Sequence, residues 1–171
     1  MDLKAKTMIG EFFDDLDRFI YPQPLVCDTV NVSRLDLDAW RKRGLLLGEG
    51  WEKDGRVMHT GRSALWCGVM AELAPIIGPT EASRHAETLL MHSPLDRREG
   101  MVATINPRLP RWKGDEAPEG WETVRQLALI PEKQFADQPI PLHALVVFPV
   151  GHLFQWWALG MRTHVDAAVT A

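Results

Sequence analysis

Apolar residues recur every three or four positions over residues 3–20, with charged side chains between them. This period predicts an amphipathic helix. The helix should end at Tyr21-Pro22-Gln23-Pro24, because proline lacks a backbone donor and restricts the residue before it. The acidic residues near its end, Asp14, Asp15 and Asp17, are interpreted as a solvated face.

Two short helices separated by a turn are expected next. Three apolar residues could line one face of the first helix, namely Leu25, Val26 and Val30. Ser33 is a plausible N-cap for the second helix, and Gly44 follows its end as a stop signal. Leu37 and Trp40 share one face of this second helix, so we expect that face to be buried.

Residues 45–60 alternate apolar and polar side chains around three glycines. The pattern predicts a two-stranded hairpin with residues 56–60 as the return strand. A longer helix should run from about 61 to 73, and another from about 80 to 91.

Beyond residue 93 the pattern changes to segments rich in Val, Ile, Leu and Thr, which predict strands over 100–106, 123–130 and 143–148. A final helix is expected over 151–165. The fold class is therefore α+β. We predict three parts: an N-terminal amphipathic helix (1–23), a helix-turn-helix with a hairpin (24–92) and a small C-terminal strand-and-helix lobe (93–171).

Composition is that of a globular protein: 46% of the 171 residues are hydrophobic and 25% are charged. No apolar stretch reaches the roughly 18–20 residues that span a bilayer. The first residues lack a basic region followed by an apolar run, so we expect no signal peptide and no membrane partner. The expected location is the cytoplasm.

The net charge of −4 argues against a nucleic-acid partner, but the charge is unevenly distributed. Residues 31–67 carry seven basic and five acidic side chains, and this is the only net-positive segment.

Catalytic chemistry has little support in this sequence. None of the six histidines lies in a recognised catalytic motif, and we expect neither an enzyme, a cofactor nor a metal site. His85 and His92 are seven residues apart and could make a metal pair, but two partly exposed helix histidines are the favoured interpretation. Cys27 and Cys67 belong to no ligand cluster and are expected to be buried thiols.

The most informative segment runs from residue 32 to 46. It has a small turn, a capped helix with Leu37 and Trp40 three residues apart, a basic end and Gly-Leu-Leu. This segment resembles the recognition helix of MerR-like regulators, and residues 55–60 are similar to that family's wing. The resemblance covers about residues 24–91 and implies a winged helix-turn-helix that binds double-stranded DNA.

On this resemblance, the start of the second helix enters the major groove, with Ser33 and Arg34 nearest the base edges. Its basic end and the wing flank the DNA strands and reach phosphates. The implied DNA-binding residues are Ser33, Arg34, Arg41, Lys42, Arg43, Lys53, Arg56, His59 and Arg62.

The segment also departs from the family's pattern. Asp38 stands where an arginine is common, Leu35 where a polar or basic residue is expected, and Ala39 and His59 replace aromatics. The family's long dimerising helix is absent, so its metal- and drug-sensing chemistry is not carried over.

Three functions are compatible with these observations. The leading one is a DNA-binding transcriptional regulator of bacterial or phage type. The second is an architectural, excision or packaging DNA-binding protein, similar to phage excisionases or small terminase subunits. The third is a protein-interaction subunit with a degenerate helix-turn-helix, motivated by Asp36 and Asp38.

The final helix carries apolar groups on more than one face, including Trp156 and Trp157. It either packs against the three predicted strands or contacts a second subunit. Because helix-turn-helix proteins commonly pair two recognition helices, we expect a homo-oligomer.

Overall fold

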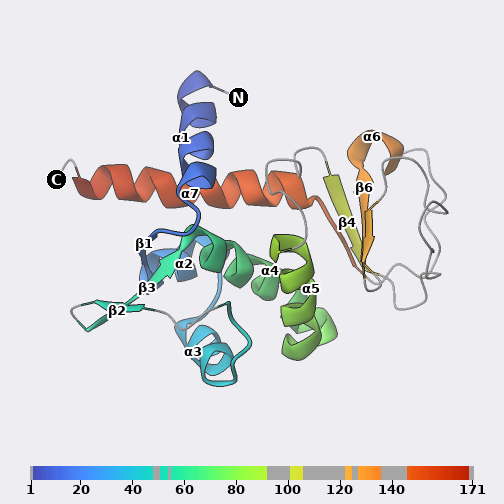
Figure 1. Cartoon of the computed structure of the whole chain (residues 1–171), viewed down its shortest axis with the longest axis horizontal. Helices are drawn as coiled ribbons and strands as arrows, with labels where there is room; N and C mark the ends of the chain where they lie inside the picture. Colours follow the sequence, from blue (N-terminus) through green and yellow to red (C-terminus); the bar gives the residue numbers. More distant parts are fainter. Residues whose placement is uncertain are drawn as a thin grey trace. The chain divides into compact units, whose positions relative to one another are not determined.

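The computed structural model describes residues 2–47, 51–53, 55–91, 101–105, 122–124, 127–135 and 146–169. These residues form seven helices and two small antiparallel sheets, which confirms the predicted α+β class (Figure 1). The chain divides into two compact units, one of Met1–His92 with Phe154–Ala171 and the other of Ser93–Leu153.

The first unit contains a three-stranded sheet and six of the helices. Its elements are α1 (Leu3–Asp14), β1 (Phe19–Pro22), α2 (Gln23–Val30), α3 (Arg34–Lys42), β2 (Trp51–Lys53), β3 (Arg56–Thr60), α4 (Gly61–Ile77), α5 (Pro79–Met91) and most of α7 (Val150–Val169). The strand order is β1-β3-β2 with antiparallel pairing. The hairpin predicted from the glycines is thus formed by β2 and β3.

The strand β1 was not expected, because the helical period continues to Ile20. The helix α1 instead ends at Asp14, and Phe19 and Tyr21 pair with the far end of β3. Since Pro22 cannot donate a ladder hydrogen bond, its place in a strand at the edge of the sheet is the expected one. Residues 19–22 therefore share a sheet with the segment that follows, and residues 1–23 lie in the same compact unit as that segment.

The helix α4 is the centre of the first unit. Nearly all side chains of its first ten residues are buried, so apolar groups surround the helix instead of marking one stripe. Its end is marked by Gly78, whose φ of 82° turns the chain into α5. The helix runs beyond the predicted end at residue 73 and contains Pro75.

Residues 154–169 of α7 belong to the first unit. Phe154, Trp157 and Met161 are buried there, and the Trp157 ring lies directly over Gly68 of α4. Arg162 Nη2 donates to Glu11 Oε2 of α1 at 2.6 Å. The predicted lobe of residues 93–171 therefore loses residues 154–171 to the first unit, and Trp157 packs on α4 instead of the predicted strands.

The second unit contains a four-stranded antiparallel sheet in the order β5-β6-β4-β7. Its elements are β4 (Met101–Ile105), β5 (Glu122–Val124), β6 (Leu127–Pro131), the short helix α6 (Glu132–Phe135), β7 (Val146–Phe148) and the start of α7. Where the sequence predicts a single strand over 123–130, the structure has two antiparallel strands, β5 and β6, that pair with each other. Residues 100, 106, 125–126 and 143–145 of the three predicted strands lie outside the described residues.

Candidate nucleic-acid interface

The helices α2 and α3 are joined by a tight three-residue turn. Asn31 takes the left-handed conformation, with a φ of 54°, and ends α2. Ser33 begins α3 as its N-cap, as predicted: its Oγ accepts the Asp36 N–H at 3.0 Å and donates to Asp36 Oδ2 at 2.6 Å. The two short helices and the turn between them that the sequence predicts are therefore present.

One face of α3 is anchored in the core, and it is the predicted one. Leu37 and Trp40 are both buried. The loop after α3 is held at Leu45, whose carbonyl oxygen accepts Trp66 Nε1 of α4 at 3.0 Å and Ser83 Oγ of α5 at 2.7 Å. The packing and these two bonds determine which side of α3 faces solvent.

Asp38 is the centre of a polar network along one flank of α3. Its Oδ1 accepts the amide of buried Gln23, at the start of α2, at 2.9 Å. The same oxygen accepts Arg41 Nη2 at 3.3 Å, and Arg34 Nε lies 3.8 Å from Oδ2. Asp38, which departs from the MerR-like pattern, therefore lies between two arginines, and its bond to Gln23 connects α3 to α2.

The outward face of α3 has an apolar centre. Leu35 is 82% exposed, and Ala39 and Lys42 are exposed one and two turns further along. Residues at these spacings lie in one row on a helix. The sequence marks Leu35 only as a departure from the resembled family, and its place at the middle of this face follows from the structure.

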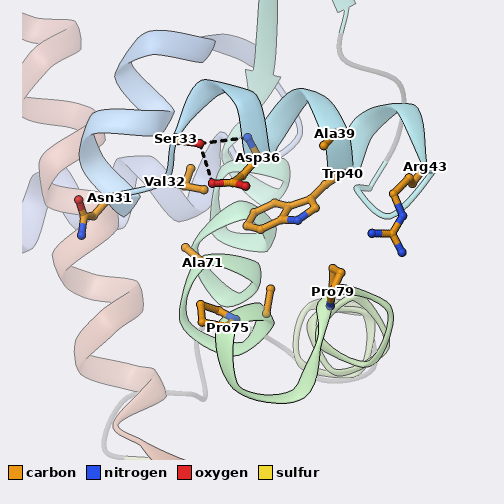
Figure 2. A pocket seen from close by; sticks show the side chains of 11 residues that line it. Asn31, Val32, Ser33, Asp36, Ala39, Trp40, Arg43, Ala71, Pro75 and Pro79 are labelled. Atoms are coloured by element: carbon orange, nitrogen blue, oxygen red, sulfur yellow. Dashed lines mark hydrogen bonds between the residues drawn. The ribbon is translucent and has the colours of Figure 1, made fainter.

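The basic end of α3 borders a pocket of about 460 Å³ between α3 and the bend from α4 to α5. Figure 2 shows Asp36 and Arg43 on the α3 side of this pocket, with Ala71, Pro75 and Pro79 opposite. Arg43 Nη2 lies 3.5 Å from Thr80 Oγ1, a long hydrogen bond that leaves this exposed guanidinium accessible. Lys42 is also exposed.

The β2–β3 hairpin contributes a further cation. Arg56 is exposed and lies opposite Lys53 in the strand register, next to Gly55 with its φ of 72°. The backbone of Lys53 is described, but its side chain lies outside the described residues.

Two predicted DNA contacts are corrected because their side chains are engaged inside the fold. His59 is 2% exposed, and its Nδ1 lies 3.0 Å from Ser63 Oγ. Burial, together with the nearby positive charge of Arg41, lowers the pKa of His59 from 6.5 to about 4. The imidazole of His59 is therefore neutral at pH 7 and buried, so it offers neither a charge nor an accessible N–H to a phosphate.

Arg62 is the second correction. Its Nε and Nη2 donate to the two carboxylate oxygens of Asp17 at 2.8 and 3.2 Å, and its Nη1 donates to the Leu90 carbonyl at 3.0 Å. The hydrogen bond from Arg62 holds the pKa of Asp17 below its usual value. This bidentate pair joins α4 to the segment after α1 and to the end of α5, so Arg62 is a structural residue.

The remaining titratable candidates that the structure describes are buried. Cys27 and Cys67 are buried as expected, and burial raises the pKa of both thiols. His85 is buried instead of partly exposed, and burial lowers its pKa; His92 lies outside the described residues. Among the described residues, no group of three or more His, Cys, Asp or Glu side chains could hold a metal ion.

Comparisons with known proteins give no relative. No protein-family model, no curated protein and no solved structure matches the chain. In the part of the chain that the structure describes, no helix combines the length and the apolar character needed to cross a bilayer.

Proposed function

We propose that the first unit is a winged helix-turn-helix that binds double-stranded DNA, with α3 as the recognition helix and the β2–β3 hairpin as the wing. The strongest support is that α3 is anchored in the core by one face and exposes the other. One face is anchored by Leu37 and Trp40, while the opposite face and the basic end are exposed. A helix presented in this way fits the major groove, which admits one α-helix.

The charges around α3 favour a polyanion. Four cationic side chains on α3 and at its end outnumber the two carboxylates of α3; the cations are Arg34, Arg41, Lys42 and Arg43. One of those carboxylates, Asp38, is already paired with arginines. The local excess of positive charge is therefore available to phosphates despite the acidic whole chain.

The proposed roles follow from exposure and position. Lys42, Arg43 and Arg56 lie at the exposed edges of the surface and would contact phosphates. Arg34, at the first turn of α3, lies nearest the base edges together with Ser33, whose hydroxyl already caps the helix. His59 and Arg62 hold the scaffold and are left out of the contact set.

Within this class, the favoured role is a transcriptional regulator of the MerR-like winged type. The order of turn, capped helix, hairpin and capped helix supports it: Thr60 caps α4 by accepting the Ser63 N–H at 3.0 Å. A regulator of this kind would act as a dimer on two half-sites. On α7, Trp156 is 69% exposed and is a candidate for the contact between subunits.

A second candidate is a protein-interaction subunit. The exposed leucine at the centre of α3 favours it, because an apolar side chain there would also suit a protein partner. The two candidates make opposite predictions about DNA.

Capture of genomic fragments by the full-length protein, followed by sequencing, separates them. If the protein is a regulator, discrete sites near promoters should be enriched. If it is a packaging or excision protein, enrichment should occur at one mobile element. The double variant Lys42→Ala/Arg43→Ala should lose enrichment, whereas Lys4→Ala/Lys6→Ala, which removes two exposed lysines from α1, should retain it. Absence of enrichment with the wild type would favour the interaction subunit and contradict DNA binding.

A further inference from the structure

The centre of the α3 outward face offers methyl groups where recognition helices commonly offer hydrogen-bonding side chains. Leu35 is 82% exposed, and Ala39 follows one turn later on the same face. Ala39 is exposed but also lines the pocket beside α3, whereas Leu35 does not line that pocket and faces solvent directly.

The polar side chains around this row already have partners. Ser33 and Asp36 bond to each other at the helix start. The Asp38 carboxylate accepts hydrogen bonds from Gln23 and Arg41, and the Arg34 guanidinium lies beside it. Hydrogen-bonding readout by these groups would require breaking contacts within the protein, whereas contact through Leu35 requires none.

Resting on the proposed DNA-binding function, we propose that Leu35 and Ala39 read the C5-methyl groups of thymines in the major groove. Of the four bases, only thymine presents a methyl group there, and apolar side chains recognise it by contact. The ligand class is therefore a duplex with thymines at the positions that face the first two turns of α3.

Charge favours DNA over an apolar protein surface as the occupant. Lys42 continues the same row as Leu35 and Ala39, and Arg34 and Arg41 lie along its flank. A row of methyl groups bordered by cations is complementary to the floor of a major groove bordered by phosphates.

The test compares two duplexes that differ only in methyl groups. One is a 20-base-pair duplex of the sequence enriched in the genomic capture; the other has the same sequence with every thymine replaced by deoxyuridine. Affinities of the full-length protein are measured by fluorescence anisotropy. Loss of one or two methyl contacts should weaken wild-type binding by roughly three- to tenfold.

Leu35→Ala should bind the thymine duplex more weakly and should bind the two duplexes equally. The matched control is Leu3→Ala, which truncates a leucine of α1 that is 79% exposed, and it should retain the full preference for thymine. Equal melting temperatures of the two variants would show that both are folded.

The outcomes separate this inference from the function on which it rests. Enriched sites that wild type binds equally with thymine or deoxyuridine would overturn methyl readout and leave DNA binding standing. A preference for thymine that persists in Leu35→Ala would also overturn it. If no duplex is bound, the DNA-binding proposal falls and the inference falls with it.

Discussion

Replacement of Asp38 probes the connection between the two helices of the proposed DNA-binding unit. Asp38→Ala removes the acceptor of the Gln23 amide, which is buried, and both arginine contacts. Asp38→Asn keeps an amide oxygen that can accept the same hydrogen bond but removes the charge. The two variants therefore separate the hydrogen bond from the ion pairs.

The magnitude follows from burial. An unpaired buried amide costs about 1–3 kcal/mol. The arginine contacts add little, because Arg34 is 75% exposed and surface pairs contribute about 0–1 kcal/mol each. Asp38→Ala should therefore lower the free energy of unfolding by about 2–3 kcal/mol, and Asp38→Asn by about 1 kcal/mol or less.

Thermal unfolding followed by circular dichroism measures the difference. About 2 kcal/mol corresponds to a fall of roughly 4–8 °C in Tm for a chain of this size. Asp28→Ala, which removes an exposed carboxylate from α2, is the charge control and should change Tm little. Equal losses for Asp38→Ala and Asp38→Asn would refute the argument that the Gln23 bond carries the effect.

Three further predictions concern the first unit. Trp40→Ala should cost about 3–5 kcal/mol, like other large buried aromatics, and unchanged chemical denaturation would show that Trp40 is not structural. Gly68→Ala should cost about 1–3 kcal/mol, because an added Cβ would lie 2.6 Å from the Trp157 ring; an unchanged Tm would contradict this packing. Below pH 6.5 the unfolded chain binds a proton at His59, whereas the folded protein does so only near pH 4. The free energy of unfolding should therefore be highest above pH 6.5. It should fall by up to about 3 kcal/mol toward pH 4, and His59→Gln should flatten this fall in urea titrations, with His85 contributing in the same direction.

Local signals in the sequence were sufficient for the elements of the proposed DNA-binding unit. The Ser33 cap, the spacing of Leu37 and Trp40, and the glycines around the hairpin all act within a few residues of each other. Such short-range chemistry is visible in a single sequence.

Long-range partners were not visible in the same way. The strand β1 forms because β3, about forty residues later, offers an edge, and the helical period up to Ile20 concealed it. The sequence predicts a phosphate contact for Arg62, because its partner Asp17 lies 45 residues away and no local pattern indicates their pairing. The sequence predicts the apolar faces of the final helix but not the element against which they pack, because the contact of Trp157 with Gly68 depends on the tertiary fold.

Binding to duplex DNA as a function of salt tests the central proposal most directly. Fluorescence anisotropy of the full-length protein should show affinity that falls as salt rises, because each phosphate contact releases counterions. Lys42→Ala should flatten the log–log slope by about one unit, whereas Lys4→Ala on α1 should leave the slope unchanged. Binding that is absent or independent of salt, or equal flattening by the two variants, would contradict the assignment of α3 as the DNA-binding helix.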